Sequence, residues 1–255
     1  GFVVYANDHR IHGQSVKNHD YLGYYDGDDY FLDAVNDMRQ LTEIIKKEHP
    51  KKKIILFGHS MGSLLSREYV TIYGDDIQAL ILSGTASFMK GLGSVGLFSA
   101  KILGQINGKY RSNELLKNLF FTQFNKKFKP NRTNVDWISS DEHQVDLFEA
   151  DPLRIEDFSL SVFRDILKGT KKVNETKAFE NTPKELPILI FSGDKDPVGE
   201  MGKGVLKVAK NYEKNGIKNL TLKIYKGGRH EMLHEINRKE VEQDVINWLN
   251  ASIKA

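Results

Sequence analysis

The chain has 255 residues, of which 40% are hydrophobic and 28% are charged, and its formal net charge is +3. These values suit one large α/β domain or a domain with an insertion, and the absence of a long basic stripe argues against a nucleic-acid partner. The lack of cysteine excludes disulfides, thiol nucleophiles and cysteine-based metal sites. No stretch approaches about 18 uninterrupted apolar residues, so no membrane-spanning helix is predicted.

Strands and helices are predicted to alternate in the first third of the chain. Residues 2–6 (FVVYA) form an apolar run of β-branched and aromatic residues, which predicts a buried strand. A helix is predicted next over residues 29–47, where apolar residues recur at three- and four-residue spacing. The elements expected after it are strand 53–57, helix 61–73 and strand 77–82. This alternation predicts a mainly parallel sheet with helices on both faces, an α/β fold.

Residues 85–184 interrupt this alternation, because no convincing strand pattern occurs in them. Helices are predicted there over residues 113–127, 141–149 and 159–167. The alternation then returns with strand 188–192, helix 202–215, strand 220–225 and helix 238–253. We therefore expect a core formed by residues 1–84 and 185–255, with residues 85–184 inserted as a helical cap over one end of the sheet.

A G-x-S-x-G pattern, Gly58-His59-Ser60-Met61-Gly62, lies between a predicted strand and a predicted helix. A sharp strand-to-helix turn projects a serine hydroxyl toward a base, which a weak nucleophile needs. Neighbouring chain segments are expected to crowd the positions two before and two after the serine, where glycine fits. The N-terminus of the following helix offers free N–H groups, so the Met61 N–H is expected to donate to an oxyanion.

A serine nucleophile also needs a base and an acid, in the chain order serine, acid, histidine. The late strands supply both, because one is followed by SGDKDPV and the next by KGGRHEM. Strand ends of a parallel sheet lie at one edge, where ligand sites form. We predict Ser60 as the nucleophile, Asp196 as the acid and His230 as the base.

Each of these two segments contains an alternative residue. Asp194 competes with Asp196, but it directly follows a glycine and is expected to brace the turn. His234 competes with His230, but it is expected on the face of a helix. His230 follows a flexible Gly-Gly-Arg loop and is the preferred base.

The other histidines are expected to have structural roles. His59 adjoins the serine, yet adjacent residues at such a turn point apart, so we expect it to pack or hydrogen bond under the turn. His12 and Asp8 follow the first predicted strand and are expected to form a hydrogen-bonded loop scaffold. The remaining histidines show no ligand spacing, and neither a metal ion nor another cofactor is predicted: His9, His19, His49, His143.

These motifs resemble those of the α/β-hydrolase superfamily, and more closely those of bacterial lysophospholipase and monoacylglycerol lipase-like serine hydrolases. The similarity extends over nearly all of the chain, through ANDHRIHGQS, GHSMGS, WISSDEHQVDLFEADPL, SGDKDPVG and GGRHEMLHE. The resemblance implies Ser60, Asp196 and His230 as nucleophile, acid and base, in agreement with the argument from spacing.

Two departures from the family pattern are visible. The first loop of relatives usually reads R-G-H-G, whereas Ile11 replaces the first glycine here, which is expected to alter the loop conformation. Relatives also carry earlier strands and a His-Gly loop that supplies a second oxyanion donor. We therefore expect an N-terminally shortened hydrolase that lacks its first strands and has half an oxyanion hole.

The expected activity is hydrolysis of a carboxylic ester, either of a monoacyl lipid (lysophospholipid or monoacylglycerol) or of a short acyl ester, through an acyl-enzyme. One alternative is a peptidase or thioesterase on the same scaffold, since this fold supports many chemistries. Another is a binding module or an inactive shortened form. An acyl ester is the expected small-molecule partner.

The cap segment 88–130 combines basic and apolar residues. Its cations outnumber its one acidic residue, Glu114, and it is rich in phenylalanine and leucine: Lys90, Lys101, Lys109, Arg111, Lys117, Lys126, Lys127, Lys129, and Phe88, Leu92, Phe98, Leu103, Leu119, Phe120, Phe121, Phe124, Phe128. This composition suits peripheral contact with a phospholipid surface. The alternative is that the aromatic residues pack inside the cap and the lysines are solvated. A cytoplasmic location is expected, with membrane association as a further hypothesis.

Overall fold

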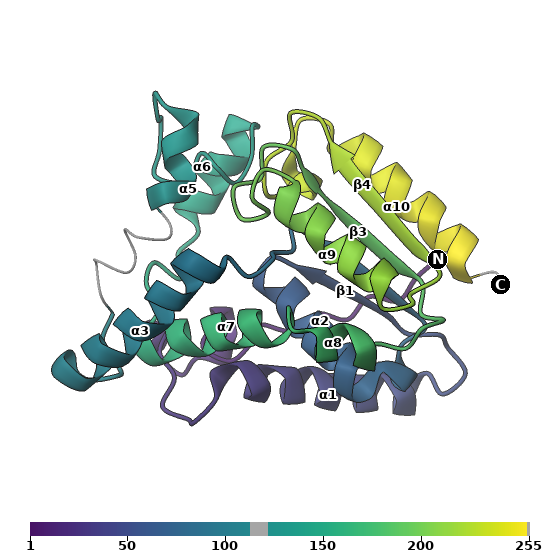
Figure 1. Ribbon diagram of the computed structural model, residues 1–255, viewed down its shortest axis with the longest axis horizontal. Coiled ribbons are helices and arrows are strands. Elements are labelled where there is room, and N and C mark those ends of the chain that lie inside the picture. Colours follow the sequence, from purple (N-terminus) through teal and green to yellow (C-terminus); the bar gives the residue numbers. More distant parts are fainter. Residues whose placement is uncertain (113–121, 254–255) are drawn as a thin grey trace.

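The computed structural model describes residues 1–112 and 122–253. Its sheet has four parallel strands in the spatial order β1-β2-β3-β4, with β1 at Ile55–His59, β2 at Ala79–Ser83, β3 at Ile188–Gly193 and β4 at Leu220–Tyr225 (Figure 1). Because all strands run in the same direction, their carboxyl ends lie at one edge of the sheet. The predicted α/β class and the predicted parallel sheet are confirmed.

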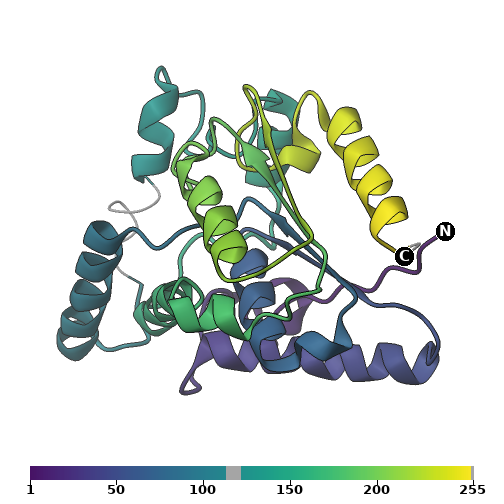
Figure 2. The ribbon, with the colours of Figure 1, turned by 45° about the vertical axis from the view of Figure 1, so that its right-hand side comes forward.

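Helices cover both faces of this sheet and extend beyond its carboxyl edge (Figures 1 and 2). The helices are α1 (Tyr30–Glu48), α2 (Met61–Tyr73), α3 (Lys90–Asn107), α5 (Gln123–Asn125), α6 (Glu142–Ala150), α7 (Leu160–Lys172), α8 (Thr176–Asn181), α9 (Lys203–Lys214) and α10 (Arg238–Ile253). Short 3-10 turns occur at η1 (Gly13–Ser15), η2 (His19–Tyr21), η3 (Gly74–Asp76), η5 (Lys126–Phe128) and η6 (Met232–His234).

Alternating side chains of the central strands form two separate apolar cores. Leu80 and Leu82 of β2 face the layer of α1, α2 and α9, where they are fully buried. Ile81, between them, faces the opposite way and packs in the cluster that contains Val241 of α10. This period of two is the geometry of a strand buried on both faces. The sequence ALIL (residues 79–82) therefore reads as an unbroken apolar run, because neither face meets water.

Most predicted elements are found within a few residues of their expected bounds. The predicted helix at residues 113–127 lies largely outside the described residues, and only its end is seen, as α5 and η5. Helix α3 was not predicted, because it is rich in glycine and apolar on more than one face. Helix α8, which has six residues, was also missed.

Two layers of helices can be distinguished between β2 and β3. Helices α7 and α8 pack against α1 and α2, so they lie beside the core. Helices α3, α5 and α6 stand beyond the carboxyl edge of the sheet (Figure 1). The division into a core of residues 1–84 and 185–255 with a cap at residues 85–184 stays a prediction.

The predicted strand at residues 2–6 is wrong. This segment carries no strand hydrogen bonds, and Phe2, Val3 and Val4 are 53%, 68% and 83% exposed. A strand requires a neighbour whose N–H and C=O groups complete its ladder, and β1 pairs only with β2 among the described residues. The segment is held instead by the hydroxyl of Tyr5, which contacts Glu48 and His49 at the end of α1.

The loop after this segment contains an isoleucine, Ile11, with an unusual backbone conformation. Ile11 has a φ of 68° and is only 5% exposed, so a β-branched residue occupies the left-handed region that glycine favours. Its carbonyl accepts a hydrogen bond from the Gly23 N–H at 3.0 Å. Burial of the side chain in the main core offsets the backbone strain.

Candidate active site

Ser60 occupies the turn between β1 and α2. Its φ of 51° and ψ of −120° are strained for a residue with a side chain, and its N–H donates to the Ser83 carbonyl at 2.9 Å. Strain of this kind projects the hydroxyl away from the sheet. Helix α2 begins at Met61, whose N–H therefore has no acceptor inside the helix and is free to bind an anion.

The two glycines of the motif differ in how closely other atoms surround them. A Cβ on Gly58 would lie 2.4 Å from both the Gly62 carbonyl oxygen and Ser66 Oγ, so only glycine allows strand and helix to approach this closely. A Cβ on Gly62 would meet nothing within 4 Å. The expected crowding is therefore found at Gly58 and is absent at Gly62.

His230 and Asp196 come together with Ser60 in a chain of hydrogen bonds. His230 Nε2 lies 2.8 Å from Ser60 Oγ, and its Nδ1 lies 3.0 Å from Asp196 Oδ1. The carboxylate also accepts from Ser192 Oγ at 2.7 Å and from the Val198 N–H at 2.9 Å. The structure thus brings together the side chains predicted as nucleophile, base and acid.

Burial and charge act in opposite directions on this pair. Burial raises the pKa of Asp196, but the adjacent His230 and the hydrogen bonds to the carboxylate lower the pKa below its ordinary value overall. Burial likewise lowers the pKa of His230, and the charge and hydrogen bond of Asp196 reverse this, so that the pKa is raised. With Asp196 and His230 only 0% and 2% exposed, little water screens their interaction.

The two loops that carry the acid and the base touch through glycines. A Cβ on Gly193 would lie 1.9 Å from the Gly228 carbonyl oxygen, which itself accepts from the Lys195 N–H at 2.9 Å. Asp194 accepts from the Gly227 N–H at 2.8 Å, so its side chain links the loops at a place away from the imidazole. Asp196, the preferred acid, is the aspartate that reaches His230.

Two residues pack against the imidazole: Gly84, which was not singled out from the sequence, and His59, which was expected to pack or hydrogen bond under the turn. Gly84 has a φ of 58°, and a Cβ on it would lie 2.9 Å from His230 Cε1. His59 Nδ1 lies 3.1 Å from Ser83 Oγ, and its ring centroid is 4.8 Å from that of His230. Burial lowers the pKa of His59 to about 3, with the nearby His230 contributing, so His59 stays neutral beside the base. The sequence signal that could have pointed to Gly84 is the Ser83-Gly84 pair at the end of β2.

The other candidate residues lie apart from the chain of hydrogen bonds. His234 is in the short turn η6, is exposed, and contacts Glu231 at 2.7 Å. Asp8 accepts from the Gln14 N–H at 2.8 Å inside the first loop. His12 contacts the Arg10 carbonyl at 3.1 Å and also reaches the wall of the cavity described next.

A cavity of about 290 Å³ opens beside Ser60. The core supplies Met61 and Gly84 to its walls, and the segment after β2 supplies Phe88 and Met89. Further walls come from the cap and α7: Phe124, Trp137, Phe158, Phe163, Ile166, Leu167. Since hydrocarbon side chains dominate this lining, the space beside Ser60 suits an apolar group.

The fold and this arrangement of serine, histidine and carboxylate at the carboxyl edge of a parallel sheet are those of the α/β-hydrolases. The family model described as "Serine aminopeptidase, S33" matches residues 1–237. The chain belongs to that family.

Several relatives and solved structures are similar over almost the whole chain. A monoacylglycerol lipase from Mycolicibacterium smegmatis is 29% identical, with 98% of this chain and 78% of the relative aligned. A monoglyceride lipase from Mus musculus is 26% identical, with 99% and 75% aligned. The crystal structure of a thermostable carboxyl esterase from Bacillus coagulans superposes with a TM-score of 0.89 at 27% identity, covering 96% of this chain and 79% of that chain.

The contrast between the two motif glycines leads to a direct test. Gly58→Ala forces a Cβ against the backbone of α2, so we expect the free energy of unfolding to fall by about 2 kcal/mol or more. Gly62→Ala places its methyl in open space in the first turn of α2, so we expect a change of about 0.5 kcal/mol at most, in the stabilising direction. Urea denaturation of both variants measures this difference, and equal losses would contradict it.

Proposed function

We propose that this carboxylic ester hydrolase cleaves monoacyl lipids, monoacylglycerol or lysophospholipid, or short acyl esters, through an acyl-enzyme on Ser60. The observation that carries the proposal is the continuous hydrogen-bond chain from Ser60 Oγ through His230 to Asp196, set at the wall of an apolar cavity. Nucleophile, base and orienting acid are all within hydrogen-bond reach, as acyl transfer requires.

In the first half of the reaction, Ser60 Oγ attacks the ester carbonyl carbon while His230 Nε2 takes the hydroxyl proton. Asp196 holds the tautomer with the proton on Nδ1 and stabilises the imidazolium that forms. His230 then gives its proton to the leaving alcohol, and the acyl-enzyme remains. In the second half, His230 takes a proton from water, the hydroxide attacks the acyl carbon, and the free acid leaves as Ser60 regains its proton.

The negative charge on the tetrahedral intermediate is placed at the start of α2. The Met61 N–H is the proposed donor to this oxyanion, assisted by the positive end of the helix dipole. The neutral His59 beneath the base adds no positive charge that would oppose the imidazolium. The expected shortage of a second backbone donor stays a prediction.

The walls of the cavity favour an acyl chain over a peptide amine. An aminopeptidase must hold a charged α-amino group, which requires a carboxylate close to the nucleophile. Among the described residues that line the cavity, none is an aspartate or glutamate. This supports an ester with an apolar acyl group, in agreement with the names of the monoacylglycerol lipases and the carboxyl esterase to which the chain is similar.

Substitution of the proposed nucleophile tests both mechanism and substrate class. Ser60→Ala should abolish labelling by a fluorophosphonate and lower kcat on monoacylglycerol by roughly 10³-fold or more, because no hydroxyl remains to form the acyl-enzyme. The wild-type protein should hydrolyse a series of p-nitrophenyl esters and leave an aminoacyl p-nitroanilide uncleaved. Labelling of Ser60→Ala equal to that of wild type would refute the nucleophile, and preferred cleavage of the anilide would refute the substrate class.

The acid–base pair predicts a specific pH dependence. Only neutral His230 can accept the serine proton, so kcat/KM should rise with pH through a pKa above the ordinary histidine value of about 6.5. Asp196→Asn removes the charge that raises this pKa while burial still lowers it. The acid limb should therefore move to lower pH, and kcat should fall by roughly 10⁴-fold. An acid limb that stays in place in Asp196→Asn would show that Asp196 does not set the pKa of the base.

The proposal includes peripheral contact between α3 and a membrane surface. Val95, Phe98, Ile102 and Ile106 recur at helical spacing on α3 and are 53%, 66%, 37% and 73% exposed. An adjoining side of α3 packs against α7 through Leu92, Ala100 and Leu103. Helix α3 also carries Lys90 and Lys101 and has no acidic residue, so it suits an anionic lipid surface.

Several residues of the predicted lipid-binding surface are not found on the exposed face of α3. Phe124 and Phe88 line the cavity beside Ser60, whereas Glu114, Lys117, Leu119, Phe120 and Phe121 lie outside the described residues. Within the described parts of the chain, no helix has the length and apolarity that would cross a bilayer. A cytoplasmic location stays a prediction.

A vesicle assay tests this contact. Phe98→Ser should reduce co-sedimentation with vesicles of anionic phospholipid several-fold, because it removes exposed apolar area from the centre of the stripe. Its kcat on soluble p-nitrophenyl butyrate should match that of wild type. Phe2→Ser, at an exposed phenylalanine far from α3, is the matched control. Binding that depends neither on anionic lipid content nor on Phe98 would refute the contact.

A further inference from the structure

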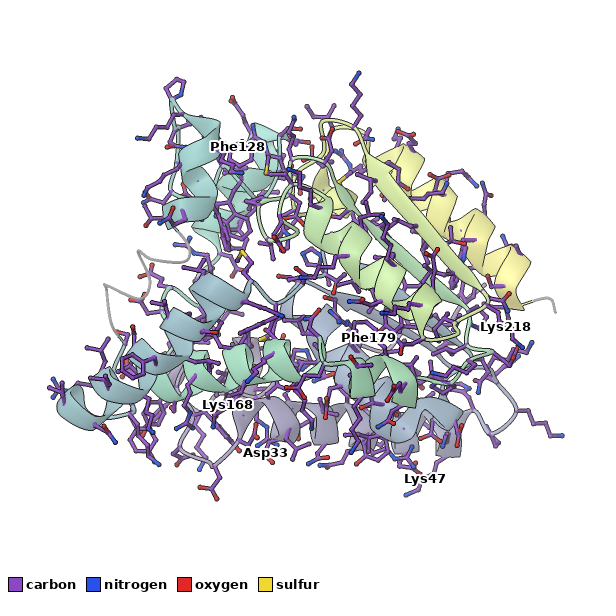
Figure 3. All side chains as sticks on the ribbon, viewed as in Figure 1. Asp33, Lys47, Phe128, Lys168, Phe179 and Lys218 are labelled. Carbon is purple, nitrogen blue, oxygen red and sulfur yellow. The ribbon has the colours of Figure 1, made fainter. Side chains whose placement is uncertain are left out.

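The cap is fastened to the loop that carries the proposed base. Cap residues 136–140 lie against residues 229–235, and both backbones and side chains take part. The contacts are Glu231 N–H to Ile138 O at 2.7 Å, Ser139 Oγ to His234 O at 2.8 Å, Arg229 Nη1 to Ser139 O at 2.9 Å and Arg229 Nη1 to Asp136 O. Figure 3 shows Phe128 where the cap meets these loops, and the Arg229 guanidinium lies 4.4 Å from the centre of its ring.

Glu235 lies at the centre of this junction. Its Oε1 accepts from the Arg229 N–H at 2.7 Å and from the Ser140 N–H at 3.1 Å. Its Oε2 accepts from Ser140 Oγ and from the Ile236 N–H at 3.3 Å. The carboxylate is only 1% exposed, so these donors replace the water that a charged group needs. One side chain therefore joins the residue that precedes His230 to the cap.

The fastened cap segment places an aromatic ring against the base. The ring centroids of Trp137 and His230 are 5.2 Å apart, with an angle of 44° between their planes. Trp137 also contacts Phe124, at 5.2 Å, and lines the cavity. An indole at this distance restricts rotation of the imidazole and favours its protonated form electrostatically.

We propose that Glu235 is a positioning residue of the hydrolytic reaction, which holds cap residues 136–140 on the His230 loop so that the indole of Trp137 keeps the imidazole within reach of Ser60. This role rests on the proposed function, in which His230 is the base. Glu235 acts through other groups and touches no reacting atom. Misplacing a base by about 1 Å costs up to roughly 100-fold in rate, so a residue of this kind affects kcat as well as folding.

Three substitutions separate positioning from stability. Glu235→Ala removes every acceptor, so kcat on p-nitrophenyl butyrate should fall about tenfold while KM changes less than about twofold. Glu235→Gln keeps an oxygen that accepts from the Arg229 and Ser140 N–H groups, so its kcat should stay within about threefold of wild type. Glu240→Gln makes the same chemical change at an exposed site in α10 and is the control with unchanged kcat.

Tryptophan emission reports the contact without any substrate. The chain has two tryptophans, so Trp248→Phe leaves Trp137 as the single emitter. A protonated imidazole quenches an indole in contact with it, and the emission should therefore rise with pH as His230 loses its proton. Adding Glu235→Ala should abolish this titration. Asp196, His59 and Glu231, the charged or titratable groups beside His230, set its midpoint but are unchanged in the comparison.

The outcomes are distinct. A tenfold loss of kcat with a lost emission titration, together with rescue by Glu235→Gln, supports the proposal. Wild-type kcat in Glu235→Ala with only a lower Tm would overturn it, as would a loss in Glu235→Gln equal to that in Glu235→Ala. If Glu235→Ala does not fold, Ser140→Ala removes one donor to the carboxylate and should lower kcat about threefold, and an unchanged kcat overturns the proposal. Full activity of Ser60→Ala would refute the proposed function and leave the emission result unaffected.

Discussion

The burial of a negatively charged carboxylate, that of Asp196, is the constraint on which the rest of this site depends. Asp196 is fully buried, and its carboxylate persists there because an imidazole, a hydroxyl and a backbone N–H surround it. Those donors come from the end of β3 and from two different loops, so their alignment requires the strands to be in register. The same pairing raises the pKa of His230, whose Nε2 lies 2.8 Å from Ser60 Oγ.

Close contact between backbones makes that alignment possible. Gly58 lets β1 approach α2, Gly193 lets the loop of Asp196 touch the loop of His230, and Gly84 leaves room for the imidazole. A methyl group at any of these positions would overlap a neighbouring atom. The strained φ of Ser60 belongs to the same set of close approaches, because the turn must be sharp for the hydroxyl to reach His230 Nε2.

Two parts of the cap differ in what they contact. Through Glu235 and Arg229 it is fastened to the loop of the base, whereas α3 packs mainly on α7 and leaves an apolar stripe exposed. Trp137, on the fastened part, contacts both the imidazole and the cavity. A group that fills the cavity would therefore touch Trp137, which also contacts His230.

The sequence by itself predicted the parallel sheet and most helices, because apolar periodicity and local turn chemistry are properties of short segments. It also singled out Ser60, Asp196 and His230, which the structure brings within hydrogen-bond reach of one another. It also favoured Asp196 over Asp194, and in the structure Asp196 contacts His230 while Asp194 accepts from the Gly227 N–H. Only the tertiary structure decided that residues 2–6 form no strand, that Gly62 is uncrowded, that Trp137 lies beside His230 and that Glu235 joins Arg229 to Ser140. Each of these depends on which distant segment becomes a neighbour, and the spacing of residues along a chain does not contain that information.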